Sequence, residues 1–477
     1  GVAATAIPEC EELIELATPH IYRRNLFRVL GLPVNASPKD VQQQQNRRKI
    51  QEKLGIAASA HHGGPLVLEP PPTEEDIRAA MERLNRPVDR LLDELFWFWP
   101  TNGSVAGDPA LKAVEQGNVD KAAKLWTEQA ELGGQREIAT HNLAVLDHLV
   151  ALDYEARLAS QSLDTKEQEP LADLWLRVFV RWGEVLDGEE FWSVVKNRVR
   201  DLDDAQLTTG FVRRVRGTLP TALLLINAKI AYSAAERSDS ELARQHYQLL
   251  QLADFRCGLA DEAIRESLKP IRNRIKTATD NAKGRWTRTP HHGNRFAQEL
   301  HEQAKSMLAI VDAILPENDL TRAGLHDLVA ETMREGLVDF GNKTNDWQEC
   351  DRILKLAEEL AIGQAVKTKL SNDRAIVQQN AKDGNDWCSP GYWDLPEETI
   401  TQLEAARAKT QAGDYEGAGR LLVVLDPKIG KPLPCCLAFC LSHRGSQIAG
   451  QGLNDFSSEP TPKVQRFLDV IGRLGSV

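Results

Sequence analysis

The feature that most constrains the fold is the scarcity of strand-like sequence. Stretches in which β-branched or aromatic residues alternate with polar ones are nearly absent from the 477 residues. Long segments rich in Ala, Leu, Glu, Arg and Gln take their place, and these residues have high helix propensity. The sequence therefore predicts an all-α protein, and its length is typical of two to four domains at roughly 150 residues each.

Charge and cysteine usage restrict the classes of partner and compartment. The chain has 58 basic and 69 acidic residues, a net charge of -11, which argues against wholesale binding of nucleic acid or anionic membranes. Its seven cysteines have no regular spacing, so free thiols and a cytoplasmic location are expected. No apolar run approaches the roughly 20 residues that cross a bilayer. A start at Gly1 rather than Met is consistent with a processed chain or a fragment.

Helix signals in the first hundred residues predict a small helical module. A helix is expected over 22–30, and Gly31 ends it. Ser37 and Asp40 form a capping box that starts a second helix, which runs to about residue 54. A loop, "IAASAHHGGPLVLEPPP", leads to a third helix that opens with the capping box of Thr73 and Asp76 and breaks at Pro87.

The second of these helices is basic. It carries only Asp40 and Glu52 as acidic residues, against five basic ones: Lys39, Arg47, Arg48, Lys49 and Lys53. A charge run of this kind is often a solvated helix face. It is equally consistent with a docking surface for an acidic partner, and the sequence leaves both interpretations open.

Residues 18–100 resemble a J domain, the module that docks on DnaK-type chaperone ATPases. The resemblance rests on the opening "LFRVLGLPVNAS", on the basic second helix and on "LNRPVDRLLDE". In that last stretch Leu84, Pro87 and Arg90 stand at the places of the family's Leu-x-x-Pro-x-x-Arg junction. The resemblance implies a helical fold and a DnaK-type or related protein partner that contacts the basic helix.

The loop departs from the family pattern. A J domain acts through a His-Pro-Asp tripeptide, whereas this loop has His61 and His62 followed by Gly-Gly-Pro. Family members without the tripeptide are generally thought not to trigger ATP hydrolysis, so the resemblance implies recruitment rather than stimulation. His61 and His62 are kept as candidate partner-binding residues. Without a nearby third ligand they lack the spacing of a zinc site.

Most of the remaining sequence resembles tetratricopeptide repeats, which are stacked helix pairs. The best copies are 108–131 and 405–427, and 226–250 is a looser one. Stacked pairs leave an extended groove that binds peptides or proteins. We therefore predict an α-solenoid over 101–270, a region over 271–400 that is either repeat or plain helical bundle, and a last repeat over 401–477.

A basic segment, 269–295, interrupts the repeats. It interleaves Trp286 with candidate anion-binding residues: Arg272, Arg274, Lys276, Lys283, Arg285 and Arg288. Basic residues beside an aromatic ring can bind nucleic acid or an acidic protein. The favoured interpretation is nevertheless a solvated helix face followed by an exposed loop, because the whole chain is acidic.

Motifs for catalysis, metals and cofactors are lacking. Cys435, Cys436, Cys440 and His443 contain no CxxC pair, and core packing is the better interpretation of their apolar surroundings. No phosphate-binding loop, HExxH or nucleophile–base set occurs. We therefore expect a non-catalytic J-like co-chaperone or adaptor without a cofactor. The alternative is a multiprotein scaffold that also contacts nucleic acid through 269–295.

Overall fold

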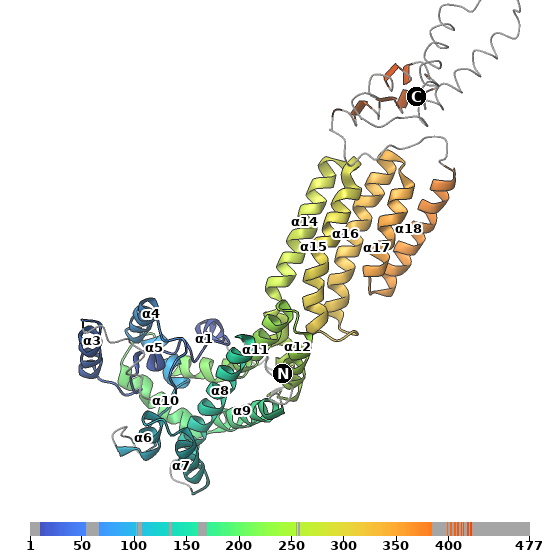
Figure 1. Cartoon of the computed structure of the whole chain (residues 1–477). Helices are drawn as coiled ribbons and strands as arrows, with labels where there is room; N and C mark the ends of the chain where they lie inside the picture. Colours follow the sequence, from blue (N-terminus) through green and yellow to red (C-terminus); the bar gives the residue numbers. More distant parts are fainter. Residues whose placement is uncertain are drawn as a thin grey trace, which may run out of the picture. The chain divides into compact units, whose positions relative to one another are not determined.

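The structure is a computed structural model of the chain (Figure 1). It describes residues 10–53, 66–101, 103, 107–132, 136–160, 169–253, 255 and 258–383, and single positions between 398 and 421. All regular elements in these ranges are helical, which confirms the all-α prediction. They fall into two compact units: residues 1–269 with 313–315, and the remainder.

Unit 1 is a series of helices, several of which pack on their neighbours in sequence. The helices are α1 (Glu11–Leu16), α2 (Leu26–Leu30), α3 (Pro38–Lys53), α4 (Glu74–Leu84), α5 (Pro87–Leu95), α6 (Pro109–Glu115), α7 (Val119–Leu132), α8 (Arg136–Ser160), α9 (Glu169–Asp187), α10 (Glu189–Leu202), α11 (Thr209–Glu236), α12 (Ser240–Leu252) and α13 (Leu259–Ser267). Neighbours in sequence that pack together include α8 on α9 and α11 on α12, whereas α1 and α13 pack on α11 and α2 packs on α4.

The N-terminal module, residues 18–100, follows its capping signals. The two predicted capping boxes are present, with Ser37 paired to Asp40 and Thr73 to Asp76. The first helix is shorter than expected: α2 begins only at Leu26, because the Asn25 side chain accepts hydrogen bonds from the backbone N–H groups of Phe27 and Arg28. Asn25 thus sets the start of α2, and the residues before it form turns.

Two of the predicted helix pairs lie in unit 1. α6 and α7 are joined at Gly117, whose φ of 91° is in the left-handed region that glycine adopts readily. Small residues allow them to pack closely, since Ala113 and Ala122 are buried. α11 and α12 form the second pair. The core between the pairs is aromatic: Trp126, Trp175, Trp182 and Trp192 are all fully buried.

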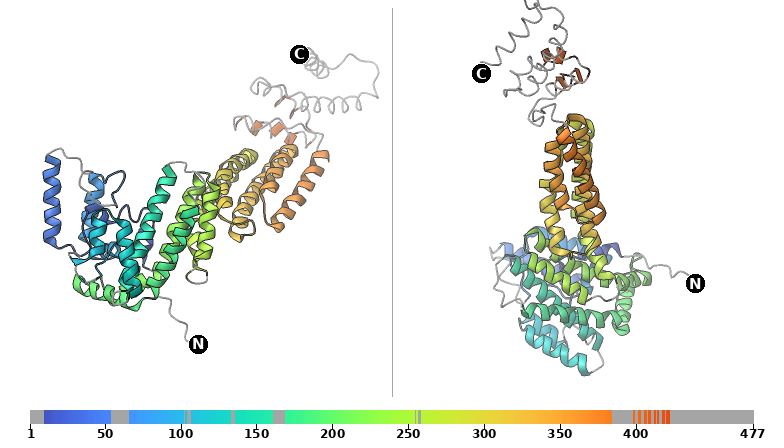
Figure 2. Two further views of the ribbon diagram at one scale, coloured as in Figure 1. Left: turned by 60° about the horizontal axis from the view of Figure 1, so that its bottom comes forward. Right: turned by 90° about the vertical axis from the view of Figure 1, so that its right-hand side faces the viewer.

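Unit 2 is a row of long helices that lie side by side in both views (Figures 1 and 2). Its elements are α14 (Lys269–Arg288), the short 3₁₀ helix η4 (Pro290–His292), α15 (Gly293–Ile314), α16 (Leu320–Thr344), α17 (Trp347–Leu360) and α18 (Gln364–Asp383). α16 packs on α17, and α17 packs on α18. Close packing depends on glycine, because a Cβ at Gly336 would lie 2.8 Å from the Trp286 ring.

The helices of both units are those of a repeat-like all-α protein. Within the described residues, no helix is both long enough and apolar enough to span a membrane.

Candidate functional site

Helix α3 projects from the N-terminal module at the edge of unit 1 (Figures 1 and 2). Its sequence gives it no apolar stripe, and its few apolar positions include Ile50, which is 57% exposed. At its start, hydrogen bonds from the Ser37 hydroxyl and backbone N–H hold the pKa of Asp40 below its ordinary value. Gln44 Nε2 ties the helix to the Leu30 carbonyl, at 3.1 Å. Such a helix presents most of its surface to solvent.

The basic residues of α3 are unneutralised where their side chains are described. Lys39, Arg47 and Lys53 are exposed, and none forms an ion pair with a carboxylate of the described chain. Arg48 and Lys49 lie on the same helix, but their side chains fall outside the described residues. His61 and His62 also lie outside them. The structure therefore supports an accessible basic surface on α3. It does not test whether His61 and His62 take part in binding.

The residues that carry the J-domain resemblance have defined roles in the module. Leu84 is 6% exposed at the end of α4, and Pro87 is the first residue of α5. Arg90 reaches from α5 to the loop before α3, where its Nη2 donates to the carbonyls of Val34 and Ala36 at 3.3 and 3.2 Å. Arg90 therefore fixes the loop from which α3 starts.

Further polar contacts anchor the module within unit 1. The Arg28 guanidinium pairs with Asp153 of α8, and the guanidinium of Arg198 on α10 pairs with Glu94 of α5. Asp93 is fully buried beside Arg83, at 2.8 Å. Burial raises the pKa of Asp93 to about 7, although the Arg83 charge opposes that rise. These contacts hold the body of the module rigidly while α3 extends from it.

The second basic surface, on α14, is partly neutralised by neighbouring helices. Lys283 pairs with Glu335 of α16, and Arg285 pairs with Glu299 of α15 at 2.5 Å. Glu299 also pairs with Arg295. Arg272, Lys276 and Arg288 are exposed and form no ion pair with the described residues. Only part of the charge counted in the sequence is therefore available to a ligand.

The aromatic residues of this segment are not available for stacking on a base. Trp286 is 2% exposed and packs against Gly336 of α16. His291 is buried in η4. The expected exposed loop after the basic helix is not found, because η4 leads directly into α15 at Gly293.

The C-terminal predictions lie largely outside the described residues. Cys435, Cys436, Cys440 and His443 fall in the undescribed part, as does most of the repeat predicted over 405–427. The cysteines that can be described, Cys10 and Cys350, are buried free thiols. Burial raises the pKa of Cys10 to about 11. No group of three or more potential metal ligands occurs among the described side chains.

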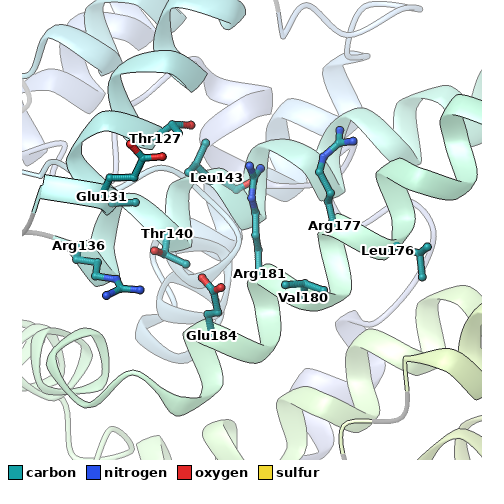
Figure 3. Close-up of a pocket in the computed structure, with 11 residues that line it drawn as sticks. Thr127, Glu131, Arg136, Thr140, Leu143, Leu176, Arg177, Val180, Arg181 and Glu184 are labelled. Atoms are coloured by element: carbon teal, nitrogen blue, oxygen red, sulfur yellow. The ribbon is translucent and has the colours of Figure 1, made fainter.

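Two cavities flank α9, and the sequence did not indicate either of them. The first, of about 390 Å³, lies between α7, α8 and α9, where the labelled side chains converge (Figure 3). Leu176 and Val180 of α9 line it, and Val180 is 63% exposed. Two arginines on its wall, Arg177 and Arg181, share the carboxylate of Asp147. The cavity thus combines an apolar floor with a wall of three arginines and two glutamates.

The second cavity, of about 510 Å³, lies between α8, α9 and α12. It shares Leu176 with the first, so the two adjoin along α9. Leu252 on its rim is 74% exposed. The sequence feature that could have indicated the two cavities is the apolar content of α9, where Leu176 and Val180 stand four residues apart and off the buried face.

Three residues spaced seven apart lie on the buried face of α8, and the last of them reaches this second cavity. His141 and His148 are buried among aromatic rings, and burial lowers their pKa values to about 4 and about 3, so both are neutral at pH 7. The third residue, Glu155, lines the cavity and accepts hydrogen bonds from Trp175 and His246. The histidines lie in the core, whereas Glu155 is buried and also lines the cavity.

Comparisons with protein-family models, with curated proteins and with solved structures gave no match to this chain.

Proposed function

We propose that the protein is a non-catalytic, J-like adaptor that recruits a DnaK-type chaperone or a related protein through α3. The observation that carries this proposal is the accessible basic surface of α3, whose described cations form no ion pairs. Unpaired surface cations steer an acidic partner and fix its orientation without being needed for the fold.

The resemblance to J domains supports the choice of partner. Leu84, Pro87 and Arg90 occupy the family positions, and each has a role in the core or in the loop contacts of the module. The His-Pro-Asp tripeptide is absent, so the adaptor recruits a chaperone without triggering its ATPase. The helical repeats would hold a client or a second protein, and the cavities along α9 offer the apolar surface for it.

Single-turnover ATP hydrolysis by a DnaK-type chaperone from the same organism tests this function. The adaptor is expected to bind the chaperone and to leave its hydrolysis rate unchanged. Stimulation that is lost on replacing His61 and His62 with alanine would instead make the protein a working co-chaperone. Failure to bind the chaperone at low salt, with the module folded by circular dichroism, would refute the adaptor.

A scaffold that contacts nucleic acid through α14 is the second candidate. The observation in its favour is that Arg272, Lys276 and Arg288 remain exposed and unpaired among the described residues. Filter binding of single-stranded DNA or RNA at two salt concentrations tests it, because phosphate contacts weaken steeply as salt rises. No binding at low salt would eliminate this candidate.

A further inference from the structure

The cavity between α8, α9 and α12 is lined mainly by apolar residues, with two glutamates among the polar ones. Its walls are apolar, with Leu171, Trp175, Leu176, Leu242 and Leu249 among them. The ionisable residues of the described lining are Glu155, Glu241 and His246, without a lysine or arginine. The cavity therefore has carboxylates but no lysine or arginine in its lining, whereas the neighbouring cavity has three arginines and two glutamates on its wall.

Glu155 is the deepest charged group of this cavity, with a side chain that is 6% exposed. Its Oε1 accepts two hydrogen bonds, from Trp175 Nε1 at 3.0 Å and from His246 Nε2 at 2.9 Å. Its other oxygen, Oε2, is buried and has no hydrogen-bond partner. The carboxylate therefore keeps one buried oxygen without a hydrogen-bond donor.

A buried carboxylate oxygen without a donor is costly, and a cationic donor relieves that cost best. Burial opposes ionisation of Glu155, but the charge of His246 and then the hydrogen bonds from His246 and Trp175 favour the charged form, so the pKa of Glu155 lies below its ordinary value. Glu155 is therefore an anion at neutral pH. An ammonium or guanidinium group on an apolar stem matches both this anion and the leucine walls.

The apolar surface around the cavity is larger than a small amine would cover. Leu252 on the rim is 74% exposed, and Leu176 leads along α9 to Val180, which is 63% exposed. Exposed aliphatic residues grouped beside a cavity are typical of a protein-binding surface. The occupant that fits is therefore a segment of a protein, with aliphatic side chains on both sides of a basic one.

We propose that this cavity binds a lysine or arginine side chain that a partner protein presents between aliphatic residues. The proposal rests on the proposed function in one respect, namely that the helical groove of unit 1 holds a second protein. It deepens that function by naming the chemistry that the groove selects, and it is independent of chaperone docking on α3.

A pair of peptides tests the proposal on the full-length protein. Both are short amphipathic helices with leucines in an i, i+4 and i+7 register, and they differ only in a central lysine or norleucine. Titration calorimetry is expected to give roughly tenfold tighter binding of the lysine peptide, since norleucine keeps the alkyl chain and loses the charge. In a small-molecule arm, n-hexylammonium should compete with the lysine peptide and hexanoate should not.

Matched variants tie the effect to the cavity. Glu155→Gln keeps the shape of the side chain and an acceptor for Trp175 and His246, and it should abolish the preference for lysine. Glu262→Gln, an exposed residue of α13 outside the cavity lining, should leave the preference unchanged. Thermal unfolding verifies that both variants are folded.

Three outcomes overturn the proposal: equal affinity of the two peptides, tighter binding of the norleucine peptide, or a lysine preference that survives in Glu155→Gln. Chaperone binding is scored separately on the same preparations. Loss of chaperone binding with the lysine preference intact would refute the function of α3 alone. Retained chaperone binding without a lysine preference would refute the cavity proposal alone.

Discussion

The two basic helices of this protein, α3 in unit 1 and α14 in unit 2, use similar sequence charge in different ways. α3 has no apolar face, and its described cations form no ion pairs. α14 buries Ile271, Ile275 and Trp286 along one face, and glutamates of neighbouring helices neutralise Lys283 and Arg285 on the other. Part of the charge on α14 is therefore used within the fold, whereas none of the described cations of α3 is.

The comparison teaches that a basic run in a sequence does not measure accessible charge. α14 has seven basic residues and α3 has five, yet each helix has three exposed cations without an ion pair among its described side chains. Availability depends on whether the helix has an apolar face that brings it against acidic neighbours.

The largest expected effect is on the buried face of α14. Trp286→Ala removes a ring that is 2% exposed against Gly336, and it should lower the free energy of unfolding of unit 2 by about 3–5 kcal/mol. Urea unfolding followed by hydrogen exchange of α14 peptides measures this change. Ile50→Ala, at a 57% exposed site of α3, is the matched change and should alter stability by less than about 0.5 kcal/mol. Similar losses in the two variants would remove the distinction between the helices.

The module that carries α3 should respond to pH through Asp93. Because burial raises the Asp93 pKa to about 7, the folded state keeps a proton that the unfolded state loses near pH 4. Stability should therefore fall as pH rises through this window, and Asp93→Asn should remove about 2 kcal/mol of the fall between roughly pH 5 and pH 8. Urea denaturation of both proteins at several pH values gives the comparison. Parallel pH profiles would show that Asp93 titrates normally.

A smaller effect is expected from reversing single charges. Arg285→Glu breaks the ion pair with Glu299 and the contact of the guanidinium with the Phe296 ring, so it should cost about 1 kcal/mol of stability. Arg47→Glu on α3 should leave stability within about 0.5 kcal/mol of the parent. Differential scanning calorimetry at low salt compares them. A destabilising Arg47→Glu would mean that α3 contributes charge to the fold.

Local signals predicted much of the fold of the N-terminal module. The pairs Ser37–Asp40 and Thr73–Asp76 are short-range patterns, and both capping boxes formed as expected. The start of α2 was misjudged although Asn25, which caps it, is a local signal. The contact from the Asn25 amide to the carbonyl of Asp93, far along the chain, has no local signature.

The candidate sites were only partly accessible to sequence reasoning. The basic residues of α3 were identified, because charge and helix period are readable from composition. The pairing of Arg285 with Glu299 was not, because it depends on how α15 packs beside α14. The cavity at Glu155 also escaped notice, since His246 and Trp175 approach it from other helices. Tertiary packing decides which charges remain available.

The most direct test of the account is the affinity of a DnaK-type chaperone for matched charge reversals in the two helices. One variant carries Lys39→Glu, Arg47→Glu and Lys53→Glu on α3, and the other carries Arg272→Glu, Lys276→Glu and Arg288→Glu on α14. Biolayer interferometry at low salt should show at least roughly tenfold weaker binding for the α3 variant and little change for the α14 variant. Unchanged binding by the α3 variant, or an equal loss in both, would contradict docking through α3.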